Sequence, residues 1–424
     1  MNEHAPEEQR KVYLTAVETT TLLGIRAQTL YAYVSKGLIR SVKQSGTKQR
    51  LYLVDDIQRV QARSAARSGH GAVAGAALQF GEPVVATSIT EITADGPCYR
   101  GRLALDIAQT GGSFEATSEL LWTGLWHDDV SWSRTLLSPA TARAIAPVLT
   151  VPAGNGELAE ILAMAVLKLG LMRGTVEERL TGGQTLQAAR EIISTMTGCF
   201  GLIGPGGKFL RSTHGQIAER LLEAVGAPRD DASVHALQAL LVLFADHELS
   251  PSTFIARVSA AAGASLHSCV AAALCGAAGV ELARMYDKIE TFLLSESSRP
   301  ALMRRAAAMH QQGQGVPGFN HPLYPQGDKR ALALLQIGRA RSGANKRLKT
   351  IFDFVDQVSR ELGLHPRHEL AAITVALSLG MPRNCAGALF MVARTAGWVA
   401  HVQEQRRSGQ LIRPRAKFVA SSAL

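Results

Sequence analysis

Hydrophobic residues recur with a helical period through most of this 424-residue chain, and no other feature constrains its fold as strongly. Amphipathic runs such as 217–225 and 234–245 are separated by Gly and Pro. Long alternations of β-branched residues, which would predict strands, are few. The sequence therefore predicts a mainly α fold. One hydrophobic core rarely serves a chain of this length, so we expect about two or three domains.

One helical segment raises the question of a membrane. Residues 258–280, between Arg257 and Glu281, contain no charged side chain and are long enough to span a bilayer. They consist mainly of Ala, Gly and Ser, include His267, and lack the aromatic residues that anchor membrane spans. We therefore expect a central helix that packs closely against its neighbours through small residues, and no membrane contact.

Cysteine usage and the N-terminal residues indicate a cellular compartment. The five cysteines are scattered and form no Cys-x-x-Cys pair, which argues against a disulfide framework and a structural metal site. The first residues are polar and charged and lack the apolar segment of a signal peptide. These features predict a cytoplasmic protein that binds no metal.

Basic residues are concentrated near the N-terminus. Residues 1–68 contain 11 Lys and Arg against 6 Asp and Glu, so half of the formal net charge of +10 lies there. Thr15 and Glu18 are spaced as a capping box for a first helix, which Gly24 ends. A second helix is predicted over 27–36, and a polar hairpin and a third helix follow.

This order of elements resembles the winged helix-turn-helix domains of the MerR and excisionase type. In such domains the second helix reads the major groove while the wing meets phosphates. The resemblance implies these DNA-contacting residues on the second helix and in the wing: Arg26, Gln28, Thr29, Tyr31, Tyr33, Lys43, Lys48 and Arg50. A small fold of this kind can instead serve assembly, and the sequence leaves both interpretations open. Residues 69–79 are interpreted as a linker.

Short segments in the rest of the chain form a specific ordered set. They are Tyr-Arg-Gly (99–101), Phe-Glu (114–115), Leu-Leu-Trp-Thr-Gly (120–124), Asp-His-Glu-Leu-Ser-Pro-Ser-Thr-Phe (246–254), Pro-Gly-Phe-Asn-His-Pro-Leu-Tyr (317–324), Gly-Asp-Lys-Arg (327–330), Arg-Thr-Ala-Gly-Trp (394–398) and Arg-Pro-Arg (413–415). No single segment is decisive, but together they resemble citrate synthase. The resemblance implies a helical large domain (80–275 and 375–424), a small domain (276–374), a homodimer and no tightly bound cofactor.

The citrate synthase resemblance also implies a reaction and its residues. An acyl-CoA, acetyl- or propionyl-CoA, condenses with oxaloacetate or a related 2-oxo acid. A base must remove a proton beside the thioester, and donors must stabilise the enol and polarise the ketone. Planar cations suit the two carboxylates. By resemblance, His247 binds oxaloacetate, His321 polarises its carbonyl, Arg330 and Arg394 bind its carboxylates, and Arg413 acts across the dimer interface.

The acyl-CoA part of the signature departs from the family. Family members carry a Gly-Pro-Leu-His-Gly-Gly-like turn whose histidine donates to the enol oxygen, whereas residues 274–284 run from one helix directly into the next. Glu369 stands where the family has its catalytic aspartate. Its extra methylene group moves the carboxylate by about an ångström, and such a displacement of a catalytic group costs on the order of a hundredfold in rate. The resemblance therefore implies an impaired or modified acyltransferase.

Other histidines are candidates for the missing donor. His267 lies about nine residues, or roughly 14 Å along a helix, before the point where the family's turn is missing, and it is too distant to replace the histidine of that turn. His365 and His368 lie beside Glu369, and we interpret them as surface histidines at a helix start, with a new acid–base pair as the alternative. Asn320 stands where the family commonly has Gly and is expected to stiffen its loop.

Three functions remain open from sequence. The first is an acyltransferase of the citrate or 2-methylcitrate synthase type. The second is a non-catalytic DNA-binding regulator that senses a di- or tricarboxylate. The third is a partner subunit that completes a heterodimer with an active paralogue through Arg413.

Overall fold

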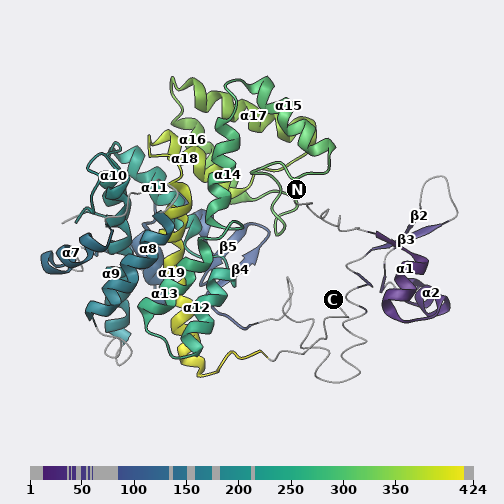
Figure 1. Cartoon of the computed structure of the whole chain (residues 1–424), viewed down its shortest axis with the longest axis horizontal. Coiled ribbons are helices and arrows are strands. Elements are labelled where there is room, and N and C mark those ends of the chain that lie inside the picture. Colours follow the sequence, from purple (N-terminus) through teal and green to yellow (C-terminus); the bar gives the residue numbers. More distant parts are fainter. Residues whose placement is uncertain are drawn as a thin grey trace, which may run out of the picture. The chain divides into compact units, whose positions relative to one another are not determined.

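The computed structural model describes residues 13–35, 38–39, 41–43, 49–53, 56–57, 60, 85–132, 137–149, 158–173, 182–211 and 215–414. The chain divides into a first unit, Met1–Ala86 with Arg413–Leu424, and a second unit, Thr87–Ile412. The second unit is almost entirely helical, which confirms the predicted mainly α fold (Figure 1). The predicted linker, 69–79, lies outside the described residues.

The elements described in full in the first unit are two short helices and a small antiparallel sheet. Its elements are β1 (Tyr13–Thr15), α1 (Ala16–Leu23), α2 (Ala27–Ser35), β2 (Ser41–Lys43) and β3 (Arg50–Leu53). The strand order is β1-β3-β2. The predicted capping box is present, because the Thr15 hydroxyl accepts from the Glu18 N–H and the Glu18 carboxylate accepts from the Thr15 N–H. Gly24 adopts the left-handed conformation (φ 62°) that ends α1.

The second unit begins with a three-stranded sheet and continues as helices. The strands are β4 (Thr90–Thr93), β5 (Gly96–Tyr99) and β6 (Arg102–Leu103), paired in the order β4-β5-β6. The helices up to the centre of the chain are α5 (Ala104–Gln109), α6 (Phe114–Thr123), α7 (Pro139–Ile145), α8 (Leu158–Arg173), α9 (Gly182–Cys199), α10 (Ile217–Val225), α11 (Asp231–Phe244), α12 (Pro251–Ala261) and α13 (Leu266–Ala277). Short 3-10 helices in the described part of the unit include η2 (Ala146–Leu149) and η5 (Phe200–Leu202).

The remaining helices carry most of the residues of interest. They are α14 (Ala283–Leu294), α15 (Arg299–Gln311), α16 (Lys329–Ala340), α17 (Lys346–Leu362), α18 (His368–Ser378) and α19 (Ala386–Ser408). Helices α14 to α18 gather at one end of the second unit (Figure 1). The predicted division into 80–275 with 375–424 and 276–374 remains a prediction.

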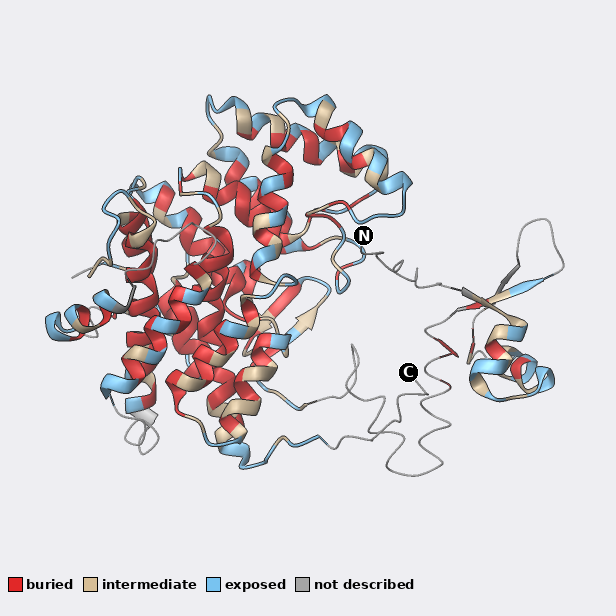
Figure 2. Ribbon diagram, in the orientation of Figure 1, coloured by how far each residue is buried: buried red, intermediate tan, exposed pale blue. Residues whose placement is uncertain are grey.

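Helix α19 lies at the centre of the second unit. It is buried on all sides along most of its length, and it packs against α6, α11, α12, α13 and α14 (Figure 2). A helix in such a position must be apolar or small on every face, and α19 is built mainly of Ala, Gly, Val and Phe in this part. The positions of its few polar side chains therefore depend on its packing.

The uncharged segment 258–280 differs from its prediction in one respect. Most of its residues are buried or half-buried, but a few near the helix ends and its last two residues are exposed, and it forms parts of two helices, α12 and α13, instead of one. Gly263 adopts φ 83°, and the Ser265 hydroxyl caps α13 by accepting from the Ser268 N–H. A glycine in the left-handed region followed by an N-cap serine ends one helix and begins the next. Within the described part of the chain, none of the helices has the length and apolarity of a membrane span.

Candidate active site

Arg330 and Asp328 form a completely buried ion pair at the start of α16. The Asp328 carboxylate accepts from Arg330 Nε (3.0 Å) and Nη2 (2.7 Å), and it also accepts from the Arg330 backbone N–H as the N-cap of α16. Burial raises the pKa of Asp328, but the Arg330 guanidinium outweighs burial and holds that pKa far below its ordinary value. Arg330 Nη1 is buried without a hydrogen-bond partner among the described residues. One donor of this guanidinium is therefore free to bind a ligand.

Two predicted histidines meet beside this ion pair. The ring centroids of His247 and His321 lie 6.2 Å apart, and both rings contact Tyr324. His247 Nε2 lies 2.6 Å from the Tyr324 hydroxyl, and the Arg330 guanidinium lies over the Tyr324 ring at 5.3 Å. The Leu323 N–H donates to His321 Nδ1, so in the neutral ring the proton is on Nε2. His321 thus has the donor that polarising a carbonyl oxygen requires.

Both imidazoles are neutral at neutral pH. Burial, and then the charges of Arg330 and Arg394, lower the pKa of His247 well below its ordinary value. Burial, and then repulsion from His368, lower the pKa of His321 to about 3. Neutral imidazoles can donate a hydrogen bond to a ketone without first binding a proton.

Glu369 lies at the start of α18 and is held by its neighbours. Its carboxylate accepts from Arg367 Nε (3.0 Å) and Nη2 (2.5 Å), and His368 Nδ1 lies 3.4 Å from it. Burial raises the pKa of Glu369, but His368 and Arg367 outweigh burial and lower the pKa to about 2. The predicted base is therefore ionised, though weakly basic.

His368 joins Glu369 to the Arg330 ion pair. The prediction that it is a surface histidine is wrong, because His368 is buried, and its Nδ1 lies 3.2 Å from Asp328 Oδ2. Its ring is 5.5 Å from that of His321. His365, in contrast, is exposed as predicted. The distance of 3.4 Å between His368 Nδ1 and Glu369 Oε2 favours the alternative that these two residues form an acid–base pair.

Arg394, on the buried helix α19, acts electrostatically on His247 together with Arg330. Its Nε donates to the Phe244 carbonyl (2.9 Å), and its guanidinium lies over the Phe390 ring at 4.8 Å. Burial lowers its pKa, while Asp246 raises it. Among the described residues no carboxylate forms an ion pair with Arg394. A buried guanidinium without a paired anion is costly, so an anionic ligand would stabilise it.

The turn that bears His247 is fixed by close packing against α19. Gly397 donates its N–H to the Ala245 carbonyl (2.9 Å), and a Cβ at Gly397 would lie 2.1 Å from Asp246 Oδ1. His401 Nε2 lies 3.3 Å from the Asp246 carboxylate. Only glycine permits this approach, which explains the Gly in the Arg-Thr-Ala-Gly-Trp segment.

We call the residues brought together here the histidine–arginine cluster. It consists of His247, His321, Tyr324, Asp328, Arg330, Arg367, His368, Glu369 and Arg394. Its predicted members come from four parts of the chain that are far apart in sequence. Two guanidinium groups with free donors beside neutral imidazoles and a carboxylate can bind a small dianion and transfer a proton.

The connection between α13 and α14 supplies no replacement for the missing donor. It spans residues 278–282, which contain no histidine, and its one charged residue, Glu281, is exposed. His267 lies against Gly170 of α8, whose Cβ position is 2.7 Å from the His267 Cβ. Asn320 adopts φ 54° and exchanges hydrogen bonds with the His365 backbone, as a stiffened loop would.

Predicted residues of the first unit can be placed only in part. Arg26 and Gln28 are exposed at the start of α2, and Tyr31 is 57% exposed. Thr29 is half-buried, and Tyr33 packs against the small core around Leu30. Arg50 is exposed and donates to the Ser41 hydroxyl, whereas Lys48 and the side chain of Lys43 lie outside the described residues. Arg413 is exposed and belongs to this unit.

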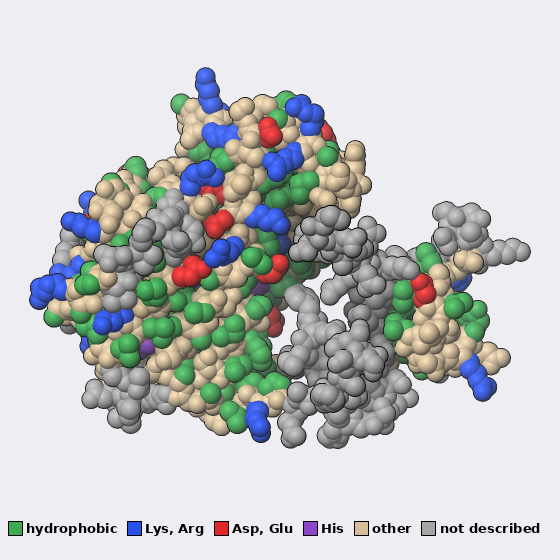
Figure 3. Space-filling view, viewed as in Figure 1, with side chains coloured by type: hydrophobic (Ala, Val, Ile, Leu, Met, Phe, Trp, Pro, Cys, Tyr) green, Lys and Arg blue, Asp and Glu red, His purple; other side chains and the backbone are tan. Residues whose placement is uncertain are grey.

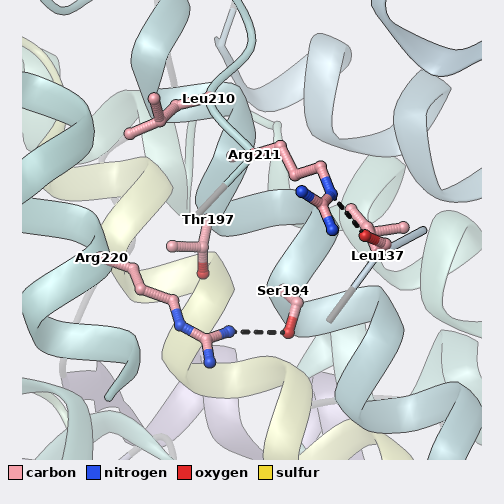
Figure 4. A pocket seen from close by; sticks show the side chains of 7 residues that line it. Leu137, Ser194, Thr197, Leu210, Arg211 and Arg220 are labelled. Atoms are coloured by element: carbon pink, nitrogen blue, oxygen red, sulfur yellow. Dashed lines mark hydrogen bonds between the residues drawn. The ribbon is translucent and has the colours of Figure 1, made fainter. Parts of the chain in front are cut away.

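A separate small cavity lies between α9 and α10. Arg211 and Arg220 line it together with Ser194 (Figure 4). Both guanidinium groups already donate to protein atoms, Arg211 to the Leu137 carbonyl (2.6 Å) and Arg220 to the Gly215 carbonyl (2.8 Å). These arginines stabilise loops and are not placed as ligand-binding groups.

Several members of the cluster were not predicted from sequence. Asp328 and Tyr324 lie inside quoted segments. The position of Asp328 two residues before Arg330 could have indicated a helix N-cap, and that of Tyr324 six residues before it a contact with the tyrosine ring. Arg367, two residues before Glu369, could have been identified as its partner. Tyr286, which is not a member of the cluster, is also buried, lies in none of the quoted segments and has its pKa raised by burial and then by Glu369. On the face drawn in Figure 3, charges of both signs are interspersed, so this surface gives no further signal.

Comparisons with known proteins identify the family of this chain. A family profile described as "Citrate synthase, C-terminal domain" matches residues 79–415. The chain is 31% identical over 213 residues to "Citrate synthase 2" of Bacillus subtilis, covering 48% of this chain and 55% of that protein. It is 29% identical over 215 residues to "2-methylcitrate synthase 2" of Corynebacterium glutamicum, covering 48% and 55%. The chain thus spans about half the length of the curated relatives that it matches.

Solved structures share the fold. Citrate synthase from Thermotoga maritima aligns with a TM-score of 0.66 at 21% identity, covering 80% of this chain and 94% of that one. The enzyme from Thermoplasma acidophilum, in a ternary complex with carboxymethyl coenzyme A and oxaloacetate, gives 0.68 at 20% identity, covering 81% and 97%. Because the profile matches most of the sequence, this chain belongs to the citrate synthase family.

Proposed function

We propose that this protein is a citrate synthase-type acyltransferase that condenses acetyl- or propionyl-CoA with oxaloacetate or a related 2-oxo acid. The observation that best supports this proposal is the buried guanidinium of Arg394, which lacks a carboxylate partner among the described residues. Arg330 Nη1 adds a second free donor in the same cluster. A dicarboxylate offers one carboxylate to each guanidinium. No tightly bound cofactor is needed.

Glu369, His321 and His247 each have a role in the proposed reaction. Glu369 takes a proton from the carbon beside the thioester, and the C–H electron pair becomes the C=C bond of the enol. That carbon then attacks the ketone carbon of the 2-oxo acid, whose oxygen accepts from His321 Nε2–H. His247 donates to the same dicarboxylate. Water then cleaves the thioester and releases CoA.

The proposed turnover is slow for two structural reasons. General bases work best when their pKa lies near the operating pH, and the pKa of Glu369 is lowered to about 2 by His368 and Arg367 despite its burial. In addition, the family's enol-stabilising histidine is absent from residues 278–282. If no other side chain donates to the enol oxygen, the loss of this donor costs roughly 10²–10³ in rate.

The proposed enzyme acts in the cytoplasm as a homodimer. In a dimer of this kind the partner subunit's Arg413 would complete the dicarboxylate site. Arg413 is exposed in the single chain, where it is available for such a contact.

A thiol-release assay tests the proposal. Purified protein is mixed with acetyl- or propionyl-CoA and oxaloacetate, and free CoA is measured for wild type, Glu369→Ala and His321→Ala. Glu361→Ala on the exposed side of α17 is the matched control. We expect release that depends on oxaloacetate, is lost in both cluster variants and is unchanged in the control. Equal release in all four proteins, or none above buffer, would refute the proposal.

The second candidate is a non-catalytic regulator that binds a di- or tricarboxylate. The bidentate Arg367–Glu369 pair favours it, because a carboxylate held in this way is a poor base. In this case the first unit, as a winged helix-turn-helix, binds DNA through α2, and its affinity falls steeply with salt and shifts with citrate. A heterodimer with an active paralogue would instead show activity only on mixing.

A further inference from the structure

Tyr286 differs from the other buried tyrosines near the histidine–arginine cluster. Its side chain is 2% exposed, and its hydroxyl has no hydrogen-bond partner among the described residues. The Tyr99 hydroxyl, in contrast, donates to the Val242 carbonyl (3.0 Å), and that of Tyr324 is bonded to His247. Leaving a buried hydroxyl unpaired costs about 1–3 kcal/mol, so its retention requires an explanation.

The face of α14 that bears Tyr286 is turned toward the helices of the cluster. The Tyr286 ring packs against Phe390 of α19 with centroids 5.7 Å apart. One turn later on the same face, Ile289 packs at Gly318, where a Cβ would lie 3.1 Å from Ile289 and 2.7 Å from Leu370 of α18. Tyr286 therefore faces α18, which carries Glu369, and α19, which carries Arg394.

The short connection between α13 and α14 allows this position. A Cβ at Gly387 would lie 2.8 Å from the Ala283 carbonyl, so the first turn of α14 rests directly on α19. Tyr286 follows three residues later. The segment in which the family carries its enol-stabilising histidine is absent immediately before this turn.

Charged groups of the cluster act electrostatically on the Tyr286 hydroxyl. Burial, and then the Glu369 carboxylate, raise its pKa well above the ordinary value, whereas Arg394, Arg330 and Arg367 lower it to a smaller extent. The hydroxyl therefore keeps its proton throughout the neutral range and remains a hydrogen-bond donor.

We propose that Tyr286 is the catalytic donor that stabilises the enol of the acyl-CoA in place of the missing imidazole. This inference rests on the proposed condensation. As Glu369 takes the proton from the carbon beside the thioester, the C–H pair forms the C=C bond, and the carbonyl pair moves onto the thioester oxygen. The Tyr286 O–H donates to that oxygen, and the carbonyl re-forms when the enol carbon attacks the ketone.

The test uses Tyr286→Phe in the full chain, which removes the hydroxyl and keeps the ring. CoA release is measured with acetyl-CoA and oxaloacetate. Enol formation is measured separately, as deuterium uptake into acetyl-CoA in D2O with malate, which lacks the ketone. Tyr52→Phe, in the first unit, deletes a hydroxyl from another buried tyrosine as the matched control.

We expect both rates to fall by roughly 10²–10³ in Tyr286→Phe. Oxaloacetate affinity and melting temperature should not fall, because the hydroxyl forms no hydrogen bond with the residues that the structure describes. If wild type is active and Tyr286→Phe retains its rates, the proposed function stands and the role of Tyr286 is refuted. If wild type shows neither CoA release nor deuterium uptake, the condensation itself is refuted, and the role of Tyr286 with it.

Discussion

Removing the charge of Asp328 should destabilise the second unit strongly. Asp328→Asn keeps the shape of the side chain and an oxygen to cap α16, but it leaves the fully buried Arg330 guanidinium without its anion. Breaking a buried ion pair from one side costs about 3–5 kcal/mol. Because domains are stable by only about 5–15 kcal/mol, such a loss is readily measured.

Urea unfolding followed by tryptophan fluorescence is the assay, because all four tryptophans lie in the second unit. The matched control is Asp95→Asn, which removes the anion from the exposed pair with Lys329, whose side chains are 61% and 51% exposed. An exposed pair of this kind contributes at most about 1 kcal/mol. Oxaloacetate should reduce the loss of unfolding free energy in Asp328→Asn, because a ligand carboxylate can neutralise the Arg330 guanidinium. Equal losses in the two variants would refute the argument that the buried pair organises the site.

Two further predictions concern pH and packing. Since the pKa of His321 is lowered to about 3, by burial first and then by His368, the unfolded chain binds a proton there between about pH 6.5 and 3 that the folded chain does not. The free energy of unfolding should therefore fall as pH falls through this window. In urea titrations, His321→Asn should reduce the slope of that free energy against pH by up to about 1.4 kcal/mol per pH unit. An unchanged slope would contradict the neutral state assigned to His321. Gly397→Ala should reduce the free energy of unfolding by about 1–3 kcal/mol or more in the same assay, because its Cβ would meet Asp246. The control Gly315→Ala, with open space around it, should change that free energy by less than about 1 kcal/mol. Similar losses in the two variants would show that the turn at Asp246 relaxes freely.

Local signals predicted much of the fold. The amphipathic run 217–225 corresponds to α10 with the same ends, and the capping box at Thr15 is present. The 258–280 segment was harder, because its Ala-rich composition favours helix throughout while Gly263 and Ser265 interrupt it. Whether a glycine in such a run breaks the helix depends on tertiary packing, which periodicity does not report.

The candidate site was predictable where segments with distinct residues carry it. His247, His321, Arg330 and Arg394 all lie in the ordered set, and the fold brings them together with Glu369. The contacts of His368 and Tyr286 were not predictable, because which face of a helix points inward is decided by its neighbours. Burial of His368 against Phe244 and of Tyr286 against Phe390 depends on α11 and α19, which are distant in sequence.

Calorimetric titration of oxaloacetate tests the central claim most directly, since that claim is that Arg394 and Arg330 hold a dicarboxylate. Wild type should bind oxaloacetate, and Arg394→Gln should weaken binding by about 10- to 100-fold, the worth of one charge-assisted contact. The control Arg284→Gln removes an exposed guanidinium paired with Glu160 and should bind as wild type does. No heat of binding to wild type, or equal affinity in Arg394→Gln, would contradict the account.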